Sequence, residues 1–233
     1  MTINNIKLKY QSGNVISDKV HKIGIIALGS HRENHGTALP IDTDSKIAAH
    51  IALNVSTKSG ATFLGIFYAA TEYDYVKHGM HLKKDDLINN QMIPQLINAK
   101  EQLNLESIII VNGHGGNNLI IGDIPFIEEK TGLNIIFNNS IIENEGPHAC
   151  TGELSMGKIL GIVNENNIES HGDFIKNPEV GMVGLKEARI NEPIIDNEAK
   201  YIEENGFRID EEFGKELLEN AEKSIIDDIY SLL

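Results

Sequence analysis

At 233 residues, with 41% hydrophobic and 23% charged residues, the chain has the composition of a globular protein with one α/β domain, or at most two small ones. The formal net charge of −14 argues against general binding to nucleic acid or to anionic membranes, because neither attracts an acidic surface. The single cysteine, Cys150, excludes an intrachain disulfide and a zinc site built from cysteines.

Apolar, β-rich runs alternate along the chain with longer amphipathic segments. The apolar runs predict strands at 22–29, 61–69, 107–112 and 134–139. Because they lack polar alternation, they are typical of a parallel sheet that is buried on both faces. Helical patterns are found at 43–58, 85–104, 117–131, 151–166 and 211–232. This order predicts a doubly wound α/β fold with a mostly parallel central sheet.

The segment 170–210 is rich in glycine, asparagine and charged residues. We expect it to be the least regular part of a single domain that spans residues 1–233. We also expect it to form a surface excursion or lid near the functional site.

A first polar cluster follows the first predicted strand, in GSHRENHGTALPIDTD (29–44). Glu33 and His35 are two residues apart, so an extended loop places their side chains on the same side, where both can serve one metal centre; we expect that centre to hold two ions. Asp44 lies at the predicted start of a helix, where its carboxylate can bridge two cations. The alternative is an ordinary helix N-cap beside a histidine that makes loop hydrogen bonds.

A second cluster, NGHGGN (112–117), follows the third predicted strand and contains His114. Its glycines allow positive φ and a close approach of the backbone to a ligand. The amides of Gly115, Gly116 and Asn117, at the start of the next helix, can hold an anion such as phosphate. The alternative is a turn that needs glycine only for its dihedral angles, with His114 capping the helix.

A third cluster, HACTGE (148–153), opens the helix after the fourth predicted strand. Glu153 can complete a coordination shell, and His148 can serve as a proton donor. The alternative is that Glu153 only stabilises the helix N-terminus. Because ligands bind doubly wound sheets at the carboxyl ends of their strands, three such clusters predict one catalytic metal centre with oxygen and imidazole ligands.

Taken together, GSxxExHG…LPxDTD, NGHGGN and HAxxxExS resemble the creatininase (creatinine amidohydrolase) family over residues 22–160. GTALPIDTD, TEYDYVKHG (71–79) and GMVGLKEAR (181–189) are similar to an archaeal branch of it. That branch releases formate from a formamidopyrimidine nucleotide in riboflavin and coenzyme F420 synthesis. The resemblance therefore implies a metal-dependent deformylase with a three-layer α/β/α fold that acts on a small pyrimidine nucleotide.

The resemblance also implies a site. Glu33 would bind one divalent metal ion, His35 the other, and Asp44 both, while His114 and Glu153 would be further ligands and His148 the proton donor to the departing amine. The branch favours Fe(II), and the ligand set also suits Zn(II) and Mn(II). The implied assembly is a homo-oligomer, a dimer or larger. Because no apolar run reaches 18 residues and no secretory signal opens the chain, we expect a cytoplasmic protein without a membrane span.

The residues that contact the substrate are less clearly indicated by the sequence than the metal ligands. Gly115, Gly116, Asn117, Lys77, Lys186 and Arg189 are candidates for the phosphate. Tyr73 and Tyr75 are candidates for stacking on the pyrimidine, with packing as the alternative. Creatininase has a glutamate where this chain has Gly116, and tryptophans that this chain lacks, which argues against creatinine as the substrate.

The other histidines are assigned to the surface or to packing: His21, His31, His50, His78, His81 and His171. A substrate contact stays open for His78 because it lies in the branch-specific segment. Cys150 is interpreted as a small buried thiol at a glycine position of the family. Two other functions are kept: a creatininase-like peptidase or cyclic-amide hydrolase, and a non-catalytic, metal-binding oligomeric scaffold.

Overall fold

A parallel sheet with the strand order β2-β1-β3-β4 forms the centre of the structure, a computed structural model that describes residues 15–233. Its strands are β1 (Ile23–Leu28), β2 (Thr62–Phe67), β3 (Ser107–Asn112) and β4 (Asn134–Asn138). All four predicted strands are therefore confirmed. Every residue of β1 and β3 is buried, which explains why their sequences show no polar alternation.

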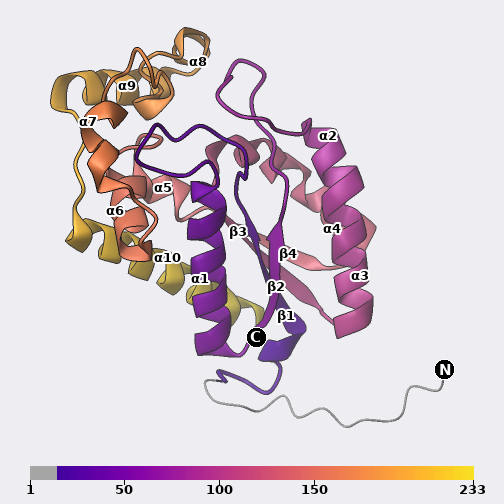
Figure 1. Ribbon diagram of the computed structural model, residues 1–233. Helices are drawn as coiled ribbons and strands as arrows, with labels where there is room; N and C mark the ends of the chain where they lie inside the picture. The colour runs from indigo at the N-terminus through magenta and orange to yellow at the C-terminus, as the bar shows by residue number, and fades with distance from the viewer. Residues whose placement is uncertain (1–14) are drawn as a thin grey trace.

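Helices cover both faces of this sheet (Figure 1). One face packs against α1 (Thr43–Ser59) and α10 (Glu211–Leu232), with α6 (Thr151–Leu160) beside α10. The other face packs against α2 (Lys84–Leu87), the π-helical turn η2 (Ile88–Met92), α3 (Ile93–Leu103) and α4 (Ile124–Thr131). The three-layer α/β/α fold is thus confirmed.

Side chains alternate between the two cores along each central strand. Ile25 and Ala27 of β1 pack with α1 and α10, whereas Ile26 and Leu28 pack with the helices of the opposite face. The chain after β1 leads to α1 on one face, and the chain after the adjacent β3 leads to α4 on the other. In such sheets, ligands bind outside the carboxyl ends of the strands at the point where the connections diverge, which here lies between β1 and β3.

Two predicted helices differ from the structure. The segment 117–131 begins as a 3-10 helix, η3 (Gly115–Asp123), and becomes α-helical only in α4, because Pro125 in the first turn of α4 has no N–H to continue the preceding helix. The predicted helix 151–166 ends at Leu160, where Gly161 adopts φ 72° and caps α6 in the left-handed conformation.

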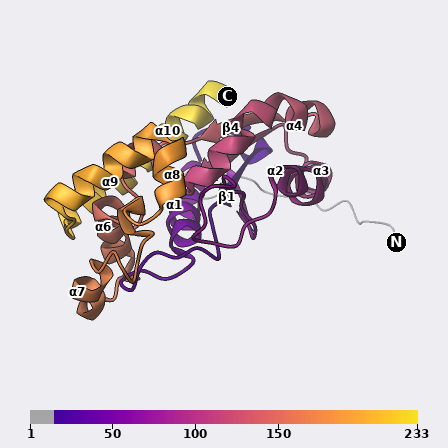
Figure 2. The ribbon, with the colours of Figure 1, turned by 90° about the horizontal axis from the view of Figure 1, so that it is seen from above.

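The segment 170–210 is more regular than predicted. Around it the chain forms η4 (Glu165–Asn167), α7 (Ile168–His171), η5 (Val180–Met182), α8 (Lys186–Asn191) and α9 (Pro193–Asn205). Pro193 starts α9 at a position that tolerates proline, and no glycine interrupts residues 185–205. Figures 1 and 2 show these helices grouped at one end of the molecule, beside the loop that leads into α1.

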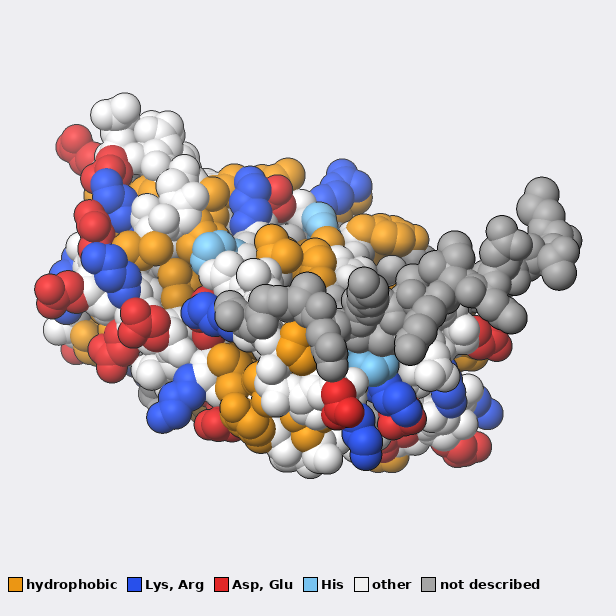
Figure 3. Space-filling model, turned by 90° about the horizontal axis from the view of Figure 1, so that it is seen from below, with side chains coloured by type: hydrophobic (Ala, Val, Ile, Leu, Met, Phe, Trp, Pro, Cys, Tyr) orange, Lys and Arg blue, Asp and Glu red, His pale blue; other side chains and the backbone are white. Residues whose placement is uncertain are grey.

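The remaining short helices are η1 (Val20–Lys22) and α5 (Ile142–Glu145). Over the described residues, no helix is both long and apolar enough to cross a membrane. Seen from below, acidic, basic and apolar side chains are interspersed over the described surface (Figure 3). The acidic excess of the chain is therefore not gathered into one block on this face.

Candidate metal centre

The five predicted metal ligands converge at the carboxyl edge of the sheet. They come from the loop after β1, the first turn of α1, the chain just after β3 and the first turn of α6. None is more than 4% exposed: Glu33, His35, Asp44, His114 and Glu153. Five ionisable side chains from four segments are therefore removed from water together, which is unusual unless they are paired or bind metal.

Two glycines allow α1 to bring Asp44 into this group. A Cβ atom on Gly29, directly after β1, would lie 2.5 Å from the backbone nitrogen of Ser45. A Cβ atom on Gly113, directly after β3, would lie 2.8 Å from the carbonyl oxygen of Asp44. The start of α1 thus rests directly on the ends of both central strands.

The carboxylate of Asp44 faces two imidazoles. Its Oδ1 lies 2.7 Å from Nε2 of His35, and its Oδ2 lies 3.1 Å from Nδ1 of His114. Each oxygen therefore belongs to a different set of ligand atoms. This is the arrangement that a bridging carboxylate requires.

Backbone carbonyls fix which ring nitrogens are free. Nδ1 of His35 lies 3.0 Å from the carbonyl oxygen of Glu33, and Nε2 of His114 lies 3.1 Å from that of Thr71. A carbonyl oxygen only accepts, so these two nitrogens carry the protons. In the neutral rings, Nε2 of His35 and Nδ1 of His114 then hold the lone pairs, and both face Asp44.

Two buried carboxylate oxygens have no hydrogen bond among the described residues, Glu33 Oε2 and Glu153 Oε2. Nδ1 of His114 lies only 2.9 Å from Glu33 Oε2, but without the alignment of a hydrogen bond. Nε2 of His35 lies 3.2 Å from Glu153 Oε2. A buried polar atom left unsatisfied costs about 1–3 kcal/mol, and more when charged. Oxygen and nitrogen atoms that approach without bonding fit a pair of divalent cations.

In the ion-free protein the imidazoles supply the positive charge. Burial disfavours ionised Glu33, yet His114 and His78 hold its pKa well below the usual range. Burial likewise disfavours protonated His35, but Asp44 and Glu153 raise its pKa well above that of a free histidine. Protons and metal ions therefore compete for the same buried atoms.

His148 lies beside this group and lines a pocket that Glu33 and Asp44 also line. Its Nε2 donates to the carbonyl oxygen of Asn34 at 2.9 Å, and its Nδ1 lies 3.4 Å from Glu153 Oε1. Burial acts against protonation, but Glu153 outweighs it and raises the pKa of His148 to about 9. His35, His148 and Glu153 also place ligand atoms within 4.8 Å of one another.

Two histidines that were assigned to the surface or to packing lie beside the predicted ligands, so the surface assignment is wrong for both. His78 hydrogen-bonds Glu33 Oε1 through Nε2, and Nε2 of His81 lies 3.5 Å from Glu33 Oε2. Their side chains are 1% and 7% exposed. The available signal was their position in a polar segment after the second predicted strand, as in the other three clusters. His171, in contrast, bonds two backbone groups and packs on Phe207.

A pocket of about 280 Å³ opens onto these residues. It is lined by Glu33, Asp44, His114 and His148, by the predicted substrate contacts Tyr73, Gly115 and Gly116, and by Met182, Ile194 and Ile195 from the 170–210 segment. Six carboxylates and no lysine or arginine lie among the residues that line it: Glu33, Asp44, Glu72, Glu145, Glu192 and Glu198. The wall facing a ligand is therefore strongly acidic.

Several predicted substrate contacts are not brought to this pocket. The amide of Asn117 is buried and bonds Thr71, Asn112 and Leu28, so it ties the strand ends together. Lys77 is exposed and lies 3.0 Å from Glu187. Arg189 is held by Asp196, Glu203 and the carbonyl oxygen of Val183. The buried thiol of Cys150 agrees with its predicted packing role.

Comparisons with known proteins identify the family of this chain. A family model described as creatininase, creatinine amidohydrolase, matches residues 14–227. A protein of Methanosphaera stadtmanae named 2-amino-5-formylamino-6-ribosylaminopyrimidin-4(3H)-one 5′-monophosphate deformylase is 71% identical over 233 residues, all of both chains. A protein of the same name from Methanobrevibacter smithii is 52% identical over 227 residues, 97% of this chain and 98% of its own.

Solved structures match the fold. A creatinine amidohydrolase (creatininase) has a TM-score of 0.59 and 16% identity, with 89% of each chain covered. A creatininase described as an Mn form has a TM-score of 0.58 and 15% identity, with 90% of each chain covered. A mutant creatininase of Zn-Zn type has a TM-score of 0.60 and 16% identity over the same share. At these identities, the likeness shows the architecture.

Proposed function

The chain belongs to the creatininase family, and from that premise we propose that it hydrolyses 2-amino-5-formylamino-6-ribosylaminopyrimidin-4(3H)-one 5′-monophosphate to formate and the free amine, a step toward riboflavin and coenzyme F420. Relatives of that name at 71% and 52% identity over nearly the full chain support the substrate. The observation that carries the chemistry is Asp44, whose two oxygens face separate ligand sets.

Divalent cations would be held by Glu33, Asp44 and His114 at one position, and by His35, Asp44 and Glu153 at the other. When bound, they supply Lewis acidity and lower the pKa of water. Carboxylate and imidazole donors suit Fe(II), Zn(II) and Mn(II), and we propose Fe(II) as the physiological metal. We also propose a homo-oligomer, which light scattering of the purified protein tests.

His148 is the proposed proton donor. Cleavage of the formamide C–N bond leaves an amine nitrogen that must take up a proton. The carbonyl oxygen of Asn34 accepts from Nε2 and so orients the ring, with Nδ1 toward the ligand carboxylates. In the ion-free protein, Glu153 raises the pKa of His148 to about 9. Because Nε2 is occupied by Asn34, Nδ1 is the nitrogen from which His148 would donate a proton to the amine.

The pocket supports a small substrate. Tyr73, stacked on Tyr75 with ring centroids 5.3 Å apart, is the proposed contact of the pyrimidine. The amides of Gly115 and Gly116 are the proposed phosphate contacts, since no lysine or arginine lines the pocket. Asn117 is not retained as a direct contact because its backbone N–H donates to the carbonyl oxygen of His114, and Lys77 is not retained because its side chain pairs with Glu187. A volume of about 280 Å³ favours a nucleotide over an extended peptide.

Formate release under anaerobic conditions, with Fe(II) added and omitted, tests the proposal. We expect metal-dependent formate from the wild-type protein and from Asp42→Ala, a control that removes the neighbouring carboxylate paired with Lys46. Asp44→Ala should lose both bound metal and turnover. Metal-loaded wild-type protein that yields no formate rejects the assignment, and peptide and cyclic-amide substrates are then to be assayed. Retained turnover in Asp44→Ala rejects the site.

A further inference from the structure

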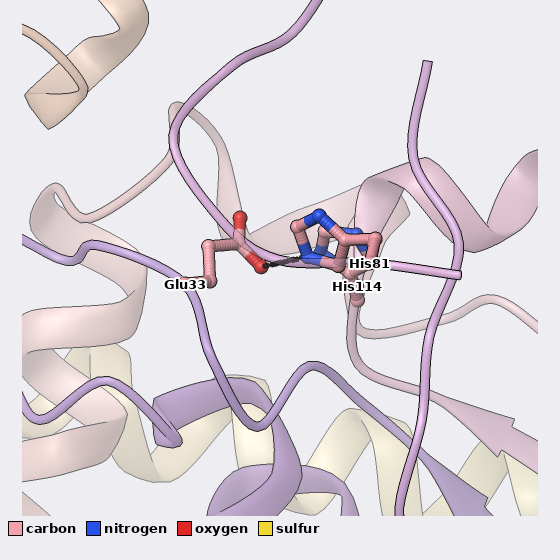
Figure 4. A group of neighbouring side chains, drawn as sticks. All are labelled: Glu33, His81 and His114. Atoms are coloured by element: carbon pink, nitrogen blue, oxygen red, sulfur yellow. Dashed lines mark ion pairs between the residues drawn. The ribbon is translucent and has the colours of Figure 1, made fainter. Parts of the chain in front are cut away.

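The loop between β2 and α2, residues 68–83, brings a third imidazole to the pair formed by Glu33 and His114. In Figure 4, the carboxylate of Glu33 points toward the rings of His81 and His114, with a dashed line marking the ion pair. The two rings are stacked, with centroids 5.0 Å apart and an interplanar angle of 14°. The ring of His81 therefore stacks on His114, a predicted ligand, and its edge faces Glu33, another predicted ligand.

The three residues meet at one atom. Oε2 of Glu33 lies 2.9 Å from Nδ1 of His114 and 3.5 Å from Nε2 of His81. The side chains of Glu33, His114 and His81 are 1%, 3% and 7% exposed. Each offers a ligand atom within 4.8 Å of the other two. One carboxylate oxygen and two ring nitrogens thus surround a common position.

The oxygen at the centre of this group is unsatisfied. His78 occupies the other oxygen of Glu33, Oε1, whereas Oε2 is buried and has no hydrogen bond among the described residues. A buried carboxylate oxygen that merely packed against imidazoles would be expected to accept a bond from one of them. Its failure to do so, with two ring nitrogens near, points to a cation at the shared position.

The backbone holds His81 in place independently of these contacts. The segment around Gly79 pairs with the segment around Glu33 in an antiparallel bridge. Met80 donates to the carbonyl oxygen of Arg32, and Asn34 donates to that of His78, each at 2.8 Å. The loop is thus fastened to the chain that carries Glu33, so the position of His81 is built into the fold.

The nitrogen that faces Glu33 can be kept free of a proton. The hydroxyl of Ser30 lies 3.0 Å from Nε2 of His81. If the hydroxyl donates, Nε2 carries a lone pair, which is the form that binds metal, and a cation would then replace the hydroxyl as the partner of that lone pair. Ser30 itself is buried, so the contact is part of the interior and not of a mobile surface.

We propose that His81 is a ligand of the divalent cation bound by Glu33 and His114, supplied by the β2–α2 loop. The inference rests on the metal-dependent function proposed above and adds a residue outside the five predicted ligands. A second imidazole at this position selects borderline transition-metal ions over Mg²⁺ and Ca²⁺, which prefer oxygen ligands.

Metal binding itself tests the assignment. Protein freed of metal is titrated anaerobically with Co(II) while the visible absorption of the ion is recorded, and the Zn(II) affinity is measured by competition with a chelating dye. Wild type is compared with His81→Ala and with His81→Gln, which retains bulk and a polar group. His50→Ala is the control, since His50 is a helix histidine whose ring bonds Asn54. Circular dichroism checks that each variant is folded.

Both His81 variants should bind Zn(II) at least tenfold more weakly and alter the Co(II) spectrum, while His50→Ala matches wild type. Wild-type spectrum and affinity in a folded His81→Gln protein would overturn the proposal, whatever happens to turnover. The proposed function fails separately: if metal binding depends on His81 but loaded wild-type protein releases no formate, the ligand assignment stands and the deformylase assignment falls.

Discussion

Glu33 is the most heavily engaged side chain of the centre, and its two oxygens differ in role. Oε1 accepts from His78, while Oε2 has no hydrogen bond among the described residues and faces His114 and His81. Nδ1 of His78 is itself buried without a hydrogen bond in the described part of the chain. The bond from His78 therefore selects which oxygen of Glu33 is presented to a cation.

Replacing His78 should weaken metal binding without removing a predicted ligand. In His78→Phe, Glu33 loses the partner of Oε1 and can rotate, so we expect metal affinity and turnover to fall by roughly 10–100-fold. Zn(II) competition and formate release measure the two effects. His50→Phe serves as control, and unchanged affinity in His78→Phe would show that the bond does not orient Glu33.

The residues of the site were predictable in part. Glu33, His35, Asp44, His114 and Glu153 follow predicted strands or open helices, so the sequence places them at one edge of the sheet, and the structure brings them together. His78 and His81 were instead assigned to the surface or to packing; they lie in the loop after β2, a strand at the edge of the sheet. The bridge between Gly79 and Glu33 holds this loop against the chain that carries Glu33, and such a contact leaves no periodic pattern in the sequence.

At the scale of elements, the site depends on how closely α1 approaches β1 and β3. Gly29 and Gly113 have no Cβ atom at the two points where the start of α1 touches the strand ends. The strands themselves were predictable, because uninterrupted apolar runs are diagnostic of a doubly buried sheet. Helix ends were less so: Gly161 and Pro125 stop or restart helices through local backbone conformation.

Gly29→Ala should therefore damage both stability and metal binding. The added methyl group would lie 2.5 Å from the backbone of Ser45, so α1 must shift, at a cost of about 1–3 kcal/mol. Because Asp44 moves with α1, metal affinity should fall as well. Urea denaturation and Zn(II) competition are the measurements. Gly122→Ala is the matched control, with no atom within 4 Å of the added group, and equal effects in both variants would contradict the explanation.

At the scale of the whole molecule, the ion-free protein is held partly by protonated imidazoles among carboxylates. Burial opposes the charge, but Glu153 raises the pKa of His148 to about 9, and Glu33 and Asp44 raise that of His114 well above its usual value against the same opposition. A histidine whose pKa is higher in the folded than in the unfolded protein stabilises the folded state. This stabilisation is complete below the unfolded pKa of about 6.5, and it is lost as the pH rises through the folded pKa.

Chelator-treated protein should accordingly lose thermal stability as pH rises from about 6.5 to 9. Thermal unfolding followed by circular dichroism across this window measures the decrease. In His148→Gln the melting temperature should fall less steeply with pH, because the titrating imidazole is gone. A melting temperature that is constant or rises over the window in chelator-treated wild type would contradict the assigned charge state of these histidines.

The acidic pocket has a consequence for how the two ligands of this protein depend on one another. Acidic groups outnumber the protonated imidazoles of His114 and His148 along the pocket wall, even though burial and Glu153 raise the pKa of Glu145, so the ion-free pocket does not favour a nucleotide monophosphate. Under the proposed function, bound cations would add positive charge to this wall, so metal and nucleotide would strengthen each other's binding, each by the same factor. Loss of metal would then first weaken the binding of the nucleotide. A high nucleotide concentration would in turn slow the removal of metal by chelators.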